Sequence, residues 1–368
     1  MIPHTPLDPV QLSPAAKRAL GPGPGKLMAA RGLMPLPPGD QVAVLYQLSI
    51  DGDANIVQFA RATAAGLPDK LLAGTLSDPG NDPRVLDLFA ELAADKPAVF
   101  DAIVLNPVVA DETIATLATR AGSREVDLIA ENEQRLLRHP AIIAAMYMNR
   151  RARMSTIDRV VELAVRNHVR VPGLAAWDEV ARALTGSMNT GSVDDAVFEN
   201  LVTPRDDTAL THGDADQVLP EDAAEQPAVQ DNRRIPFREL TVPQKIRAAT
   251  LGDAFIRSEA IRDPLRMVQM AAIKSPGVTE VEASRYASNQ ALSEDVIRYI
   301  AARREWTKMY GIKVSLCRNP KAPIAETTRL LPFLRDKDLQ NIVKSKGVPS
   351  AVVAQARKLM MQRRGGGK

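Results

Sequence analysis

A pattern of helical segments and breaks that returns after 43 or 44 residues constrains the fold more than any other feature of the sequence. Asn106 and Asn149 each follow an apolar helix end and lie 43 residues apart, and Pro276 and Pro320 lie 44 residues apart. A polar gap and a new helix start follow each asparagine. Self-similarity at a fixed period is the sequence signature of repeat architectures, in which each unit packs on its neighbours. We therefore expect a fold built from stacked helical units.

The periodicity within the segments is that of amphipathic helices. Val85, Leu88, Phe89 and Leu92 fall at positions i, i+3, i+4 and i+7, which places them on one helical face. Residues 40–184 show no convincing alternation of period two, and aromatic residues make up only 4% of the chain. A period of about 40–47 residues is typical of HEAT or armadillo hairpins. The sequence predicts an all-α fold, a HEAT-like α-solenoid of helical hairpins in two halves joined by a disordered acidic linker.

Capping residues and prolines mark the ends of the expected helices. Thr279 and Glu282 can form a capping box, and Ser155 and Ser293 stand at expected N-cap positions. A proline disfavours helical conformation in the residue before it. We therefore expect the chain to leave the helix at five pre-proline residues, Asn106, His139, Asp263, Ser275 and Asn319.

Charge is distributed unevenly along the chain, although the net charge is only +3. Residues 1–185 hold 19 Lys and Arg against 21 Asp and Glu, residues 186–232 hold one Arg against 11 acids, and residues 233–368 hold 27 against 12. The acidic stretch has few large apolar side chains, so it buries too little surface to offset its ordering entropy. The predicted organisation is a proline-rich flexible arm (1–38), an N-terminal helical-repeat domain (39–185), an acidic disordered linker (186–236), a basic C-terminal helical-repeat domain (237–361) and a basic tail (362–368).

The residue types that carry catalysis or bind metals show no functional spacing. The single cysteine, Cys317, lies in an apolar helical stretch and has no histidine after His212 to act as a base, so we expect it in the core. The four histidines, His4, His139, His168 and His212, form no metal-binding spacing. We expect no cofactor, no metal, no catalytic residue and no enzymatic activity. The apolar runs are far shorter than the ~20 residues of a membrane helix, and the N-terminus is unlike a signal peptide, which predicts a cytoplasmic protein that does not enter a membrane.

Three stretches carry a resemblance to a known group of proteins. They are "LPPGDQVAVLYQLSIDGDANI" (36–56), "ENEQRLLRHPAIIAAMYMNRRARMSTIDRVVELAVRN" (131–167) and "REWTKMYGIKVSLCRNPKAPIAETTRLLPFLRDKDLQNIVKSKGVPSAVVAQARKL" (304–359). They resemble an uncharacterised family of bacterial helical-repeat proteins, with HEAT-like and leucine-rich-variant-like repeats. The resemblance implies an α-helical repeat scaffold, and it implies no activity and no catalytic residue.

A basic and aromatic cluster in the C-terminal half is the candidate binding face. Trp306 and Tyr310 stand at i and i+4 and would share one face of a continuous helix. With the surrounding cations, the candidate partner-binding or anion-binding face consists of Arg303, Arg304, Trp306, Lys308, Tyr310, Lys313, Arg318 and Lys321. An alternative interpretation places the two aromatic side chains in the core between repeats and the cations on a solvated rim.

Two functions are compatible with this sequence. The first is a non-enzymatic scaffold or adaptor that binds protein partners through α-solenoid surfaces. The alternative is a nucleic-acid-binding helical-repeat protein, in which the basic residues of 233–368 bind nucleic acid or another polyanion. A further hypothesis is that the acidic linker folds back on the basic half and masks it as an intramolecular competitor.

Overall fold

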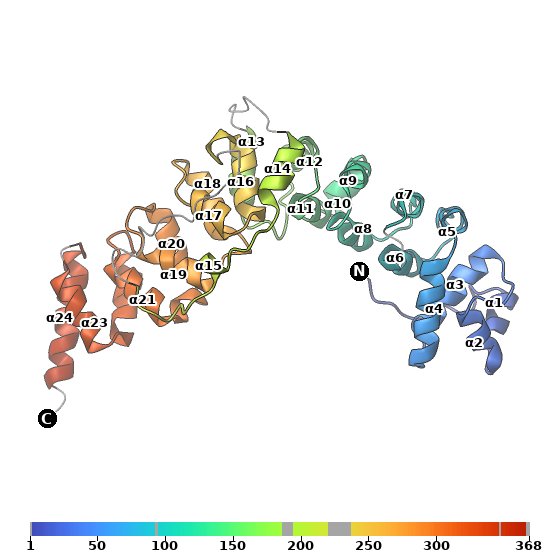
Figure 1. Cartoon of the computed structure of the whole chain (residues 1–368), viewed down its shortest axis with the longest axis horizontal. Helices are drawn as coiled ribbons and strands as arrows, with labels where there is room; N and C mark the ends of the chain where they lie inside the picture. The colour runs from blue at the N-terminus through green and yellow to red at the C-terminus, as the bar shows by residue number, and fades with distance from the viewer. Residues whose placement is uncertain (1, 93–94, 186–193, 220–236, 346, 366–368) are drawn as a thin grey trace. The chain divides into compact units, whose positions relative to one another are not determined.

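All regular secondary structure in the described part of the chain is helical, which confirms the predicted all-α class (Figure 1). The computed structural model describes residues 2–92, 95–185, 194–219, 237–345 and 347–365. The chain divides into two compact units, Met1–Gly173 and Leu174–Lys368, which we call the N-unit and the C-unit. Within the described ranges, no helix has both the length and the apolar character needed to cross a bilayer.

The N-unit consists of short helices joined by brief connections. Their bounds are α1 (Pro14–Ala19), α2 (Pro24–Ala30), α3 (Pro38–Leu48), α4 (Ala54–Gly66), α5 (Asp69–Leu76), α6 (Pro83–Leu92), α7 (Pro97–Leu105), α8 (Asp111–Ala118), α9 (Ser123–Ala130), α10 (Glu133–Arg138), α11 (Ala141–Met148) and α12 (Met154–Arg166). In α6, Val85, Leu88 and Phe89 of the predicted apolar face are buried, whereas Leu92 is half-buried. Leu86 and Ala90 are buried too, so burial extends beyond the predicted face.

The described part of the C-unit is also built from short helices, together with three 3-10 turns. Its elements are α13 (Trp177–Thr185), α14 (Asp195–Val202), α15 (Thr208–Thr211), η2 (Phe237–Glu239), α16 (Val242–Leu251), α17 (Ala254–Ala260), α18 (Arg266–Lys274), α19 (Glu280–Ser288), α20 (Glu294–Ala302), η3 (Trp306–Lys308), α21 (Tyr310–Arg318), α22 (Ile324–Leu330), η4 (Leu331–Phe333), α23 (Asp336–Lys344) and α24 (Ser350–Gly365).

The helix ends follow most of the predicted signals. All five pre-proline residues lie outside α-helices, and Thr279 and Glu282 form the predicted capping box of α19. Ser293 occupies the N-cap of α20, but its side chain makes no capping hydrogen bond. The prediction for Ser155 is wrong, because α12 already begins at Met154 and Ser155 lies inside its first turn.

A polar side chain at the end of one helix ties it to a neighbouring helix in the N-unit. Asn106 follows α7, and its Nδ2 donates to the carbonyl of Leu76 at the end of α5 at 2.8 Å. Asn149 follows α11 and donates to the carbonyl of Ala118 at the end of α8, also at 2.8 Å. Both asparagines are buried, and the Oδ1 of each accepts the backbone amide two residues later. The two breaks that are 43 residues apart therefore make the same contacts.

The C-unit contains two further contacts of this kind. Nδ2 of Asn319, which follows α21, donates to the carbonyl of Ala287 in α19 at 2.9 Å. Oγ of Ser275, which follows α18, donates to the carbonyl of Thr250 in α16 at 3.0 Å. The last turns of a helix leave carbonyls without intrahelical partners. The side chain that ends α7, α11, α18 or α21 thus satisfies a carbonyl in the last turn of α5, α8, α16 or α19.

Residues 2–38 pack against the rest of the N-unit, which differs from the expected flexible arm. Ala16 of α1 is fully buried, and Nε2 of His4 lies 2.8 Å from Oδ2 of the buried Asp87. Both α1 and α2 begin at a proline. Proline is tolerated at the first helical position because its missing amide would have no intrahelical partner there. The proline-rich composition is therefore compatible with two short packed helices.

The limits of the C-unit also differ from the expected domain bounds. It begins at Leu174, and Nζ of Lys274 in α18 lies 3.1 Å from Oε1 of the buried Glu179 in α13. At the other end, α24 continues through the described part of the expected basic tail, residues 362–365. Of the expected linker, 186–236, the stretches 186–193 and 220–236 lie outside the described residues.

Candidate functional site

The two aromatic residues of the predicted binding face do not share a helix. Trp306 opens the 3-10 turn η3, and Tyr310 is the first residue of α21. Met309 between these elements is extended, with φ −67° and ψ 131°. The prediction of a common i, i+4 face is therefore wrong, because the chain leaves the helical conformation between the two residues.

Trp306 instead forms a small cluster with the end of α20. Its ring meets that of Tyr299 edge-on, with centroids 6.1 Å apart. The guanidinium of Arg303 lies 5.0 Å from the Tyr299 ring centroid and 5.8 Å from that of Trp306. Nε of Arg303 also donates to Tyr299 Oη at 3.1 Å. These contacts orient the Arg303 side chain against α20 and η3, although the residue is exposed.

Tyr310 joins α21 to the start of α23. Its hydroxyl donates to Asp338 Oδ2 at 2.7 Å and accepts the backbone amide of Arg335 at 2.8 Å. Burial and the hydrogen bond to Asp338 raise the pKa of Tyr310 above its ordinary value. Nη2 of Arg318 lies 3.6 Å from Asp338 Oδ1, and its side chain is largely buried. Tyr310 and Arg318 therefore make contacts within the C-unit. The alternative interpretation does not fit fully either, because Trp306 and Tyr310 are only half-buried and Arg318 is not on a solvated rim.

Of the remaining cations of the predicted face, two bind backbone carbonyls of the C-unit and two have exposed side chains. Nζ of Lys321 donates to the carbonyl of Leu292 at 2.6 Å, and Nζ of Lys313 donates to the carbonyl of Lys308 at 2.8 Å. The side chains of Arg304 and Lys308 are exposed. The eight predicted residues thus belong to several local contacts, and the structure does not bring them together as one face.

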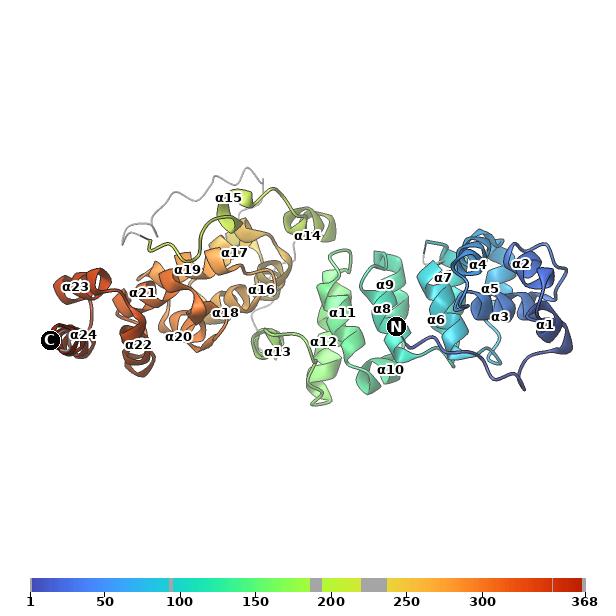
Figure 2. The ribbon, with the colours of Figure 1, turned by 90° about the horizontal axis from the view of Figure 1, so that it is seen from below.

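A different surface of the C-unit holds an extended segment of the chain itself. Residues 203–219, which we call the strap, follow α14 and run beside α17, α19 and α21 (Figures 1 and 2). The strap contains the short helix α15 and four aspartates. It lies within the expected disordered linker, but the described residues 194–219 include α14 and α15, so the prediction of disorder is wrong for them. The hypothesis that the acidic linker masks the basic half stays a prediction.

Two aspartates attach the strap at its two ends. Oδ2 of Asp207 accepts the backbone amide of Ala254, the first residue of α17, at 2.9 Å. Oδ1 of Asp216 accepts the backbone amide of Tyr310, the first residue of α21, at 2.5 Å. Both amides belong to first helical turns, whose N–H groups have no intrahelical acceptor. The strap carboxylates satisfy these donors.

Between and just beyond these two aspartates, the C-unit contacts the strap backbone. The guanidinium of Arg285 in α19 donates to the carbonyls of Ala209 at 3.1 Å and Leu210 at 3.2 Å. At α21 the strap passes so close to Gly311 that a Cβ there would lie 2.3 Å from the carbonyl oxygen of Gln217. Any side chain at position 311 would therefore exclude the strap from this path.

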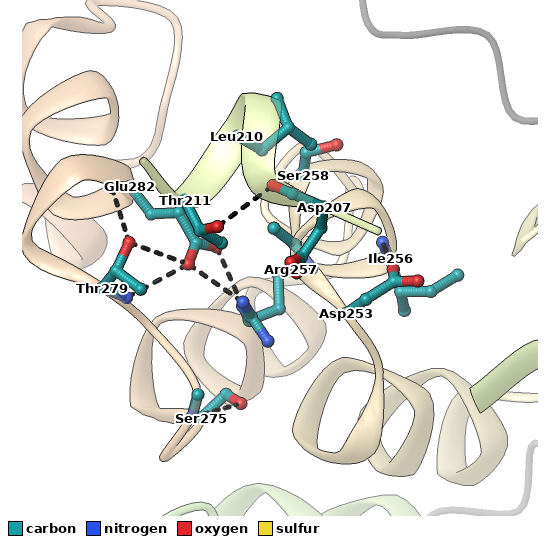
Figure 3. A network of polar contacts seen from close by, with 12 residues as sticks. Asp207, Leu210, Thr211, Asp253, Ile256, Arg257, Ser258, Ser275, Thr279 and Glu282 are labelled. Carbon is teal, nitrogen blue, oxygen red and sulfur yellow. Dashed lines mark hydrogen bonds and ion pairs between the residues drawn. The ribbon is translucent and has the colours of Figure 1, made fainter. Parts of the chain in front are cut away.

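Beneath the strap lies a buried ion pair (Figure 3). Nε and Nη2 of Arg257 each lie 2.9 Å from a carboxylate oxygen of Glu282, in a bidentate arrangement. Burial acts to lower the pKa of Arg257, but the hydrogen bonds and charge of Glu282 outweigh it, with a smaller contribution from Asp207 of the strap, so the pKa is raised. The pKa of Tyr286, whose hydroxyl lies 3.4 Å from Glu282, is raised by burial and by that carboxylate.

Cys317 has the surroundings of a core residue. Cys317 is buried in α21, which confirms its predicted place in the core, and burial raises the pKa of its thiol to about 12. The thiol therefore stays protonated near neutral pH and is a poor nucleophile there. Among the residues that the structure describes, no group of three or more His, Cys, Asp or Glu side chains is arranged to hold a metal ion.

Comparison with family models, curated proteins and solved structures found no match to this chain. The resemblance to helical-repeat proteins therefore stays a prediction. The strap contacts are what sequence reasoning missed, since Arg285 and Gly311 carry no local signal of a ligand. The only signal in the sequence was the opposite charge of the acidic linker and of the basic residues 233–368.

Proposed function

We propose that the protein is a non-enzymatic adaptor whose helix pairs form a HEAT-like α-solenoid that binds a protein partner. The equivalent contacts of Asn106, Asn149, Ser275 and Asn319 support the repetition of one helical unit. Stacked helical units present extended surfaces made of successive repeats. Such surfaces suit elongated protein segments better than small molecules.

The observation that carries this proposal is the strap. The C-unit holds an extended segment of polypeptide through its backbone carbonyls and two of its carboxylates. Contacts to backbone groups are a common means by which domains recognise peptides of varied sequence. A surface with these groups in place is chemically suited to bind part of another protein.

Affinity capture with the tagged full-length chain tests the proposal. Native lysate is crosslinked and treated with nuclease before capture, and the bound proteins are identified and then bound again with purified components. We expect at least one protein that binds directly and survives nuclease treatment. If binding disappears with the nuclease in every case, or if no purified protein binds, the adaptor proposal fails.

A second candidate function is nucleic-acid binding through the end of the C-unit. Four cations of α23 and α24 are exposed and make no ion pair with another described residue, namely Lys337, Lys344, Arg357 and Lys358. Unpaired cations of this kind can neutralise phosphates and release counterions. Titration of labelled duplex DNA and single-stranded RNA at two salt concentrations tests this candidate. Affinity should fall with salt, and replacement of the four cations by Gln should reduce the salt dependence; absence of binding at low salt excludes it.

A further inference from the structure

The strap is attached to the C-unit differently from the helix that precedes it. In α14, Phe198, Leu201 and Val202 are buried, so apolar packing holds this helix in place. In residues 203–219 no side chain is fully buried. The strap is therefore held by hydrogen bonds and by the ion pair of Arg205 with the buried Asp253, at 3.4 Å. These polar contacts are exchanged for contacts with water when it leaves. Such a segment can detach while α14 and the C-unit core stay folded.

The groups that hold the strap define the chemistry of what fits there. The amides of Ala254 and Tyr310 bind two carboxylates that are nine positions apart in the strap, at Asp207 and Asp216. Arg285 binds consecutive backbone carbonyls and requires no particular side chain on the segment. The guanidinium of Arg205 in the strap adds a basic contact, with its Nε 3.4 Å from Oδ2 of Asp253 and its Cζ 5.2 Å from the Phe255 ring centroid. These contacts therefore recognise two carboxylates, one guanidinium and the path of the backbone.

Overall charge favours the same kind of occupant. The sequence from 233 to 368 holds 27 basic residues against 12 acidic ones, whereas the strap has four aspartates and one arginine. A basic body attracts acidic segments over distances longer than a hydrogen bond, most strongly at low salt.

We propose that the strap is an intramolecular occupant of a binding site for an acidic, extended segment of a protein partner, and that the partner displaces it. This inference rests on the proposed adaptor function and names its partner class: a segment with two carboxylates nine residues apart and a backbone that passes directly over Gly311. A covalently attached occupant competes with an effective concentration in the millimolar range for short flexible connections. The partner therefore binds weakly until the strap leaves, since only the open fraction of the protein is competent.

The test measures binding of a fluorescently labelled synthetic peptide, with the sequence of residues 203–219, to the full-length protein. The releasing variant is Asp207→Ala/Asp216→Ala, which removes both strap carboxylates that contact the C-unit. The matched control is Asp206→Ala/Asp214→Ala, which removes the same charge from two exposed aspartates whose carboxylates bond only within the strap. We expect the releasing variant to bind the peptide at least tenfold more tightly than the wild type, and the control to change affinity less than twofold.

Blocking substitutions then locate the site. Gly311→Val and, separately, Arg285→Ala are added to the releasing variant, and circular dichroism verifies that each protein is folded. We expect each to weaken peptide binding at least tenfold, because the first obstructs the backbone path and the second removes the donors to two carbonyls.

Three outcomes overturn the inference: no peptide binding to the releasing variant, equal tightening by the releasing and control pairs, or binding that both blocking substitutions leave unchanged. Equal tightening would mean that general charge attraction acts without a defined site. These results are separate from the adaptor test, since a native protein partner that still binds would leave the adaptor function standing while the strap site fails.

Discussion

Replacement of Asn319 by alanine tests whether the polar contacts at helix ends stabilise the fold. Asn319 is 2% exposed, and its Nδ2 donates to the carbonyls of Ala287 at 2.9 Å and Asn289 at 3.3 Å. Its Oδ1 accepts the backbone amide of Lys321 at 3.0 Å. Alanine removes all three hydrogen bonds and leaves the carbonyl of Ala287 buried without this donor.

The magnitude follows from these contacts. The two shorter hydrogen bonds contribute about 1 kcal/mol each in net terms, and a buried group left without a partner costs about 1–3 kcal/mol. We therefore expect Asn319→Ala to lower the free energy of unfolding of the C-unit by about 3 kcal/mol, a large part of the ~5–15 kcal/mol that is typical of a domain. Asn319→Asp should cost more, because it places a carboxylate against two carbonyl oxygens.

Urea unfolding followed by tryptophan fluorescence measures this effect. Both tryptophans, Trp177 and Trp306, belong to the C-unit, so the signal reports on that unit. The midpoint should fall at an unchanged m-value. Asn341→Ala is the matched control, because Asn341 is exposed on α23, and it should change stability by less than ~0.5 kcal/mol. A loss below ~1 kcal/mol for Asn319→Ala, or one equal to the control, would refute the reasoning.

Three other changes test the remaining contacts. Glu282→Ala leaves the buried Arg257 charge unpaired and should lower the free energy of unfolding in urea by about 3–5 kcal/mol. The double variant Arg257→Met/Glu282→Ala should recover part of this loss. If the effects of the two substitutions on the free energy of unfolding were strictly additive, Arg257 and Glu282 would not be coupled. Burial raises the pKa of the Cys317 thiol from 9.0 to about 12, so the unfolded chain loses this proton at lower pH than the folded protein. The contribution of the buried thiol to the free energy of unfolding is therefore complete below about pH 9 and is lost as the pH rises toward 12. Cys317→Ala should therefore flatten the decline of unfolding free energy above pH 9, and an unchanged decline would contradict this. His4→Ala removes the contact with Asp87, which should speed limited proteolysis near the N-terminus; equal cleavage rates would show that the contact does not hold this segment.

Much of the local structure could be predicted from the sequence. The apolar spacing in α6, the capping box at Thr279 and the break at Asn319 all depend on residues within one or two helical turns of each other. The shared spacing of Asn106 and Asn149 also indicated that they are equivalent, and they make the same contacts. Local patterns of this kind are decided by backbone conformation and side-chain periodicity.

The candidate binding face was harder to predict because it required a continuous helix. The spacing of Trp306 and Tyr310 is correct for one face only if the helix runs through Met309, and it does not. The residues around Met309 have no strong local preference that would predict this break. After the break, the hydroxyl of Tyr310 contacts Asp338, which lies 28 residues further along the chain. Tertiary contacts override weak local preferences at such points.

The sequence by itself determined that this chain is helical, that five of its helices end before the prolines that follow Asn106, His139, Asp263, Ser275 and Asn319, and that its acidic and basic segments carry opposite charge. Only the tertiary structure decided where the strap lies and which residues hold it. Asp216 meets the amide of Tyr310, 94 residues away, and Arg285 meets the carbonyl of Leu210, 75 residues away. Composition describes residues 203–219 as a segment that buries too little surface to fold alone. Folded helices supply the unsatisfied amides, the guanidinium and the glycine that give this segment a defined path.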